Sequence, residues 1–90
     1  MEKKIVLTNK QGMHARPASL IVERANKHNC DVFLLKDNRK VNAKSILGLL
    51  TLASPCGDSF IIETVGDDEK IEKIALDDIV DLFKNNFFED

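Results

Sequence analysis

Short β-branched and apolar runs alternate with stretches of helical periodicity along this chain, and the alternation limits the folds that it can adopt. Some runs have the composition of strands, whereas others repeat their apolar residues at three- and four-residue intervals, as helices do. The predicted strands cover residues 4–8, 31–36, 40–43 and 59–65. The predicted helices cover residues 16–29, 45–52 and about 69–83.

This order of strand, helix, strand, strand, helix, strand and helix predicts an α+β fold. A two-layer, open-faced sandwich satisfies the order, with the helices on one face of a mostly antiparallel sheet. Ninety residues are enough for one compact domain and too few for two, so we expect a single domain over residues 1–90.

The helical periods also predict which side chains are buried. In the first helix, Ala18, Ile21, Val22 and Ala25 share one face. In the last helix the periodic apolar residues are Ile71, Ile74, Ala75, Ile79, Leu82 and Phe83. The pattern leaves two places open for Phe87 and Phe88, either against the sheet or beneath the last helix.

Charge and hydropathy exclude several classes of partner. The formal net charge is −2 and the basic residues are scattered, which argues against nucleic-acid binding and favours a protein partner. No apolar run approaches the roughly 20 residues that span a bilayer, so membrane insertion is not expected. The N-terminal residues lack a signal-peptide cleavage pattern, and we expect a cytoplasmic protein.

The cysteines and histidines form no recognisable metal-binding pattern. Cys30 and Cys56 are far apart and outside any CxxC motif, so we expect reduced thiols and no metal ion, although a disulfide stays open. The chain also lacks a glycine-rich nucleotide loop and paired carboxylates. We therefore expect no cofactor and no independent catalytic activity.

His14 is the main candidate for chemistry because it directly precedes the first predicted helix. The free backbone amides at that end, expected around residues 16–18, and the helix dipole attract anions. Arg16 adds a cation that can bind phosphate, Gly12 gives the preceding loop backbone freedom, and Pro17 fits a first helical turn. A neutral imidazole is a competent nucleophile.

A plainer interpretation of His14 is a surface histidine that caps a helix. His28 provides a contrast, since it lies at the far end of the same helix beside Lys27, where no anion-binding terminus exists. For His28 the plain interpretation is preferred.

Two segments resemble the HPr family, the phosphocarriers of the sugar phosphotransferase system. Residues 12–18 (Gly-Met-His-Ala-Arg-Pro-Ala) resemble its active-site segment, and residues 44–50 (Lys-Ser-Ile-Leu-Gly-Leu-Leu) resemble its regulatory serine segment. The resemblance implies four antiparallel strands under three helices. It also implies that His14 accepts a phosphoryl group on Nδ1 from phosphorylated enzyme I, that Arg16 neutralises it, and that IIA domains of sugar permeases receive it.

The resemblance implies a regulatory role for Ser45. In many relatives the matching serine is modified by HPr kinase/phosphorylase. We expect the added charge to weaken docking to an acidic partner and to create a surface for a different one, such as a catabolite-control repressor. A phosphate at the start of a helix would be stabilised there. The plainer interpretation of Ser45 is an ordinary helix N-cap.

The short helix predicts a docking surface. If Leu49 and Leu52 point inward, Ile46, Leu47 and Leu50 lie nearer the surface, and Leu20 of the first helix can join them. Alternatively, the helical phase is different and several of these side chains are buried.

The sequence therefore predicts a monomeric phosphocarrier. The alternative is an HPr-like regulatory module that acts through Ser45 while the histidine is idle. Departures from the family pattern include Met13, the absence of glycine in residues 37–40, and the Phe-Phe-Glu-Asp ending. None of them touches the phosphorylation chemistry, but they leave the partners open.

Overall fold

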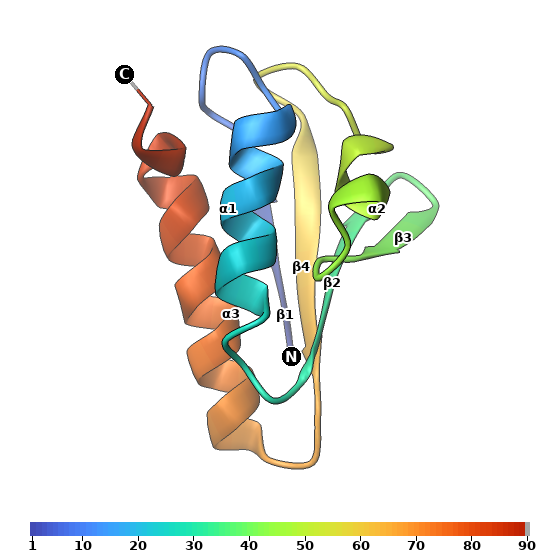
Figure 1. The fold of residues 1–90 in the computed structure, drawn as a ribbon, viewed down its shortest axis with the longest axis vertical. Coiled ribbons are helices and arrows are strands. Elements are labelled where there is room, and N and C mark those ends of the chain that lie inside the picture. The colour runs from blue at the N-terminus through green and yellow to red at the C-terminus, as the bar shows by residue number, and fades with distance from the viewer. Residues whose placement is uncertain (90) are drawn as a thin grey trace.

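The computed structural model describes residues 1–89 and confirms the predicted order of elements (Figure 1). The strands are β1 (Glu2–Val6), β2 (Asp31–Lys36), β3 (Arg39–Asn42) and β4 (Ser59–Val65). The helices are α1 (Ala15–Ala25), α2 (Ile46–Leu50) and α3 (Glu69–Lys84), followed by a short 3₁₀ turn, η1 (Asn86–Phe88).

The four strands form one sheet in the order β1-β4-β2-β3, and every neighbouring pair is antiparallel. In β4, Phe60, Ile62 and Thr64 are buried, so its alternate side chains face the helices. Figure 1 shows the helices on one face of this sheet. The predicted open-faced sandwich is confirmed.

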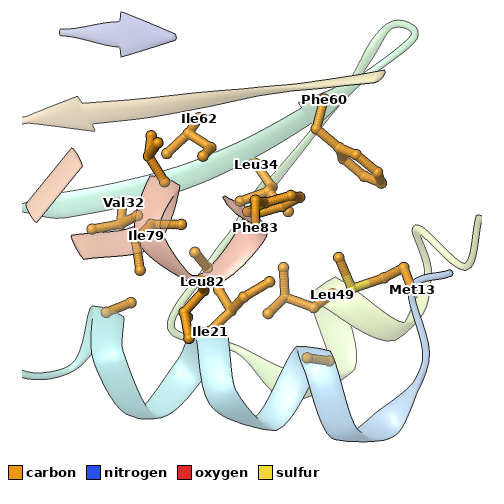
Figure 2. Close-up of a cluster of buried hydrophobic side chains, with 14 of the residues drawn as sticks. Met13, Ile21, Val32, Leu34, Leu49, Phe60, Ile62, Ile79, Leu82 and Phe83 are labelled. Carbon is orange, nitrogen blue, oxygen red and sulfur yellow. The ribbon is translucent and has the colours of Figure 1, made fainter. Parts of the chain in front are cut away.

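The core lies between the sheet and the helices (Figure 2). Three of the predicted inward residues of α1, namely Ala18, Ile21 and Ala25, are fully buried, and Val22 packs against them from a partly buried position. On α3 the prediction was wrong for Ile74, which is 61% exposed. The buried stripe of α3 contains Ala75, Leu76, Ile79, Val80, Leu82 and Phe83. Ile74 lies outside this stripe.

The first strand begins and ends two residues earlier than predicted. β1 pairs with β4 only as far as Val6. The backbone of Leu7 then bonds to the loop before β4, donating to Asp58 at 2.8 Å and accepting from Gly57 at 2.7 Å. Leu7 is fully buried at this point, which anchors the loop that leads to α1.

Both shorter helices end earlier than predicted. α1 stops at Ala25 and is capped by Asn26, the last residue whose amide bonds four residues back; the amides of Lys27 and His28 bond three residues back. α2 stops at Leu50 in a similar way, since the amides of Thr51 and Leu52 bond three residues back. Tight last turns of this kind are common at helix ends.

The C-terminal phenylalanines take opposite environments. Phe87 is fully buried, with its ring centroid 4.9 Å from that of Phe83, whereas Phe88 is 53% exposed. Residues 86–88 all have positive φ, which turns the chain back toward the start of α1. Figure 1 shows this turn at the same end of the molecule as the start of α1.

Candidate functional site

The loop before α1 is fixed by contacts that require glycine at position 12. Gly12 has φ of +70°, and a Cβ atom added there would lie 2.0 Å from the carbonyl oxygen of Ser54. The next amide, of Met13, donates to that same oxygen at 2.8 Å, and the Met13 side chain is buried. The loop is therefore held close to Ser54, and His14 follows at a defined position.

His14 is the N-cap residue of α1, with an extended backbone (φ −144°, ψ −167°). Its ring makes no capping hydrogen bond, so the side chain is not a helix cap. Its carbonyl oxygen accepts from the amide of Ala18 at 3.1 Å. In the first turn of α1, the amides of Ala15 and Arg16 have no partner in the described residues. The predicted set around residues 16–18 differs because Ala18 donates to His14 and Pro17 has no N–H.

The His14 ring is partly open to solvent, with 33% of its side chain exposed. Its Nε2 atom lies 3.0 Å from Oε2 of Glu89. No hydrogen-bond partner for Nδ1 occurs in the described part of the chain. The ring therefore has one nitrogen engaged by a carboxylate and one nitrogen available for chemistry.

Arg16 is exposed and forms no ion pair with any other residue of 1–89. It lines a depression of about 400 Å³ together with Lys10, Gln11, Phe88 and Glu89. Its lining has two cations against one carboxylate, that of Glu89, which is already bonded to His14 and Asn9. The Arg16 guanidinium is therefore the group best placed to bind an anion, since it can bind phosphate oxygens in pairs.

Sequence reasoning missed Asn9 and Glu89 at this site. Asn9 is 2% exposed, and its Nδ2 atom donates to the carbonyl of Gly12 at 2.7 Å and to Oε1 of Glu89 at 2.8 Å. Its only signal in the sequence is its place in turn-forming residues before Gly12. No local pattern marks Glu89, which lies 75 positions from His14.

The second predicted segment begins at Ser45, the N-cap of α2. Its Oγ atom accepts from the amide of Gly48 at 3.2 Å, and the residue is half-buried. Ser45 is therefore a helix cap, as the plainer interpretation predicted. This role is compatible with phosphorylation, because a phosphate is also stabilised at the start of a helix.

The predicted helical phase of α2 is confirmed. Leu49 and Leu52 are buried, whereas Ile46, Leu47 and Leu50 are 36%, 76% and 39% exposed. Leu20 is only partly exposed and packs against the core, so it adds less surface than the α2 residues do. α1 and α2 contact each other, which places this apolar surface on the same side of the molecule as α1.

His28 has a structural partner at the opposite end of α1. Its Nε2 atom lies 2.7 Å from Oδ2 of Asp78, and Arg24 donates to Oδ1 of the same carboxylate at 2.6 Å. Burial of Asp78 opposes its ionisation, yet the hydrogen bonds from His28 and Arg24 outweigh burial and lower the pKa of this carboxyl group. The group joins α1 to α3.

The cysteines are free thiols in different environments. Cys30 is buried, and burial raises the pKa of its thiol, while Cys56 is exposed. Within residues 1–89 no three metal-ligating side chains gather into one group. None of the helices described is long and apolar enough to cross a membrane.

Comparison with known proteins found a matching family model and several similar proteins. The family model described as the PTS HPr component phosphorylation site matches residues 1–85. The HPr-like protein Crh of Bacillus subtilis is 46% identical over 77 residues, covering 83% of this chain and 91% of Crh. The phosphocarrier protein HPr of Treponema pallidum is 40% identical over 88 residues, covering 98% of this chain and 97% of its own.

A solved structure agrees with these sequence matches. The crystal structure of HPr-C-His from Thermoanaerobacter tengcongensis has a TM-score of 0.90 and 41% sequence identity, and the match covers 100% of this chain and 98% of that one. The similarity therefore extends over the sheet, all three helices and the loop that carries His14.

Proposed function

Because this chain belongs to the HPr family, whose members carry phosphoryl groups between components of the phosphotransferase system and are not independent catalysts, we propose that His14 is its phosphoryl carrier. The observation that carries the proposal is the state of the His14 ring. Nδ1 has no partner among residues 1–89, and His14 directly precedes the two residues at the start of α1 whose amides are unpaired.

The chemistry is a transfer between two nitrogen nucleophiles. The lone pair of His14 Nδ1 attacks the phosphorus atom of a phosphohistidine on enzyme I, and an N–P bond forms. The donor's N–P bond breaks and its electron pair returns to the donor imidazole. The amides of Ala15 and Arg16 and the Arg16 guanidinium stabilise the phosphate, which then passes to a IIA domain of a sugar permease by the same step.

An exposed site suits a carrier because two partners must reach it in turn. The side chains of Ile46, Leu47 and Leu50, together with the exposed part of Leu20, provide an apolar surface on α2 and α1. We assign this surface to docking of enzyme I and IIA domains. One sheet and one core cluster include elements from the whole described chain, which supports a single domain. We propose that this domain acts as a monomer in the cytoplasm.

Ser45 is the proposed regulatory site. A phosphate on Oγ would add about two negative charges at the start of α2, directly before the exposed side chains of Ile46 and Leu47. Such a charge would weaken docking of the carrier's partners and create a binding site for a different one, such as a catabolite-control repressor. ATP and an HPr kinase are expected to give an acid-stable adduct that Ser45→Ala abolishes; label that persists in Ser45→Ala would refute this assignment.

The similarity to Crh favours one alternative, a regulatory module that acts through Ser45 alone. Relatives specialised in that way tend to lack the active-site histidine, whereas this chain has His14 and Arg16. The carrier function is therefore preferred.

Labelling with phosphoenolpyruvate tests the carrier function. The intact protein, incubated with catalytic enzyme I, is expected to gain one acid-labile, base-stable phosphate. His14→Ala should abolish the label, and His28→Ala should keep it, because His28 is bonded to Asp78 at the other end of α1. Absence of label with several sources of enzyme I would favour the regulatory module.

A further inference from the structure

We propose that Glu89 is a positioning residue for phosphoryl transfer: its carboxylate accepts a hydrogen bond from the Nε2–H group of His14, which keeps the proton on Nε2 and leaves the Nδ1 lone pair free to attack phosphorus. The contact joins His14 Nε2 and Glu89 Oε2 at 3.0 Å, and the Glu89 side chain is only 14% exposed. Since an ionised carboxylate can only accept hydrogen bonds, the proton of this pair belongs to Nε2. This inference rests on the proposed function of His14.

Glu89 is held in place independently of His14. Its other carboxylate oxygen, Oε1, accepts from the buried Asn9 at 2.8 Å, and Asn9 is tied to the Gly12 carbonyl. Its backbone amide donates to the carbonyl of Asn86 at 3.0 Å. The fully buried ring of Phe87 fixes the turn to the core. The carboxylate is therefore a preorganised acceptor rather than a mobile side chain that happens to meet the ring.

The negative charge of Glu89 stabilises the His14 ring in its phosphorylated form. When the neutral ring forms its N–P bond through Nδ1, the proton stays on Nε2 and the imidazole becomes a cation. The carboxylate of Glu89 stabilises that cation as it forms, and it holds the ring plane fixed. When the group moves on, the N–P electron pair returns to Nδ1 and the ring is again neutral, with the same proton on Nε2.

His28 provides an internal reference for this arrangement. Its Nε2 atom also meets a carboxylate, that of Asp78, at 2.7 Å. Both rings should therefore show an Nε2-bound proton that exchanges slowly with water, and only the His14 signal should depend on Glu89.

The test combines ring spectroscopy with transfer rates, using the full chain. In ¹⁵N-labelled protein at about pH 8, proton–nitrogen correlation spectra should show both Nε2-bound protons. In Glu89→Ala the His14 signal should be lost through exchange, while the His28 signal stays and reports an intact fold. Glu89→Gln offers one acceptor oxygen in place of two and carries no charge, so the His14 signal should shift or broaden.

Loading by enzyme I and phosphoenolpyruvate should slow by roughly tenfold in both Glu89 variants, the lower end of the loss seen when a carboxylate that orients a metal-binding histidine is removed. Glu69→Gln removes the same charge from the exposed first turn of α3, at the opposite end of that helix, and should keep the wild-type rate. An unchanged His14 ring proton, or equal loading rates in the wild type and both Glu89 variants, would overturn the role of Glu89. Absence of label on the wild type would instead contradict the proposed function.

Discussion

The Nε2 atom of His14 and the Oε2 atom of Glu89 lie 3.0 Å apart although 75 positions separate the two residues. The contact depends on the turn that follows α3, where Phe87 enters the core beside Phe83 and Glu89 emerges at the start of α1. The candidate site is therefore built from two ends of the described chain, and the stability of the core and the geometry of the site are coupled through Phe87.

Phe87→Ala should destabilise the protein by about 3 kcal/mol, since it removes a fully buried aromatic side chain. Urea unfolding measures the loss. Phe88→Ala is the matched control, because Phe88 is 53% exposed and its truncation should cost less than about 1 kcal/mol. Similar losses for the two variants would contradict the assignment of Phe87 to the core.

Gly12→Ala should destabilise the protein more than Gly57→Ala does. Both glycines have positive φ, so both variants pay roughly 1 kcal/mol of backbone strain. Only at Gly12 would the new Cβ atom meet the Ser54 carbonyl, at 2.0 Å, whereas nothing lies within 4 Å of it at Gly57. Unfolding free energies of the two variants isolate the clash, and equal values would show that the loop can move away from Ser54.

Arg16→Ala should slow phosphoryl loading by about tenfold and leave the free energy of unfolding unchanged within about 0.5 kcal/mol. The reason is that Arg16 is exposed and has no ion-pair partner within residues 1–89, so its charge is available to the incoming phosphate. Arg16→Lys keeps the charge but loses the paired hydrogen bonds, so its loading rate should lie between those of the wild type and Arg16→Ala. A large loss of stability in Arg16→Ala would point to a structural role instead.

Leu47→Glu should raise the concentration of enzyme I needed for half-maximal loading, because it places a charge within the proposed docking surface. Leu47 is 76% exposed, so stability should not change appreciably. Ile74→Glu is the matched control, since Ile74 is an equally apolar, 61% exposed residue on α3. Equal effects of the two substitutions would show that docking does not depend on α2.

The stabilisation that Asp78 contributes should be lost in acid. Its folded-state pKa is lowered, so its contribution to stability is complete above the unfolded-state value of about 3.9 and is lost as the pH falls through the lower folded-state value. Asp78→Asn should therefore be less stable than the wild type near neutral pH, and the difference should shrink in acid. Urea unfolding at several pH values measures this, with the exposed Asp77→Asn as control; a difference that does not depend on pH would contradict the prediction.

The sequence by itself determined the order of the elements, and for two central strands it determined the bounds as well. Residues 31–36 and 59–65 were predicted as strands and are strands in the structure. These strands depend on local composition and on turn residues at both ends, which act within a few positions. The placement of His14 before a helix, with Arg16 in its first turn, follows from equally local signals.

Tertiary structure decided what joins distant parts of the chain. It separated the buried Phe87 from the exposed Phe88 and left Ile74 outside the stripe that α3 buries. It also brought Glu89 to the His14 ring, with Asn9 bonded to the same carboxylate. The period of apolar residues predicts the general direction of the buried face of a helix. The width of that face depends on how much of the helix the neighbouring elements cover. A contact between side chains 75 positions apart has no local pattern at all, because packing of the whole core brings the two together.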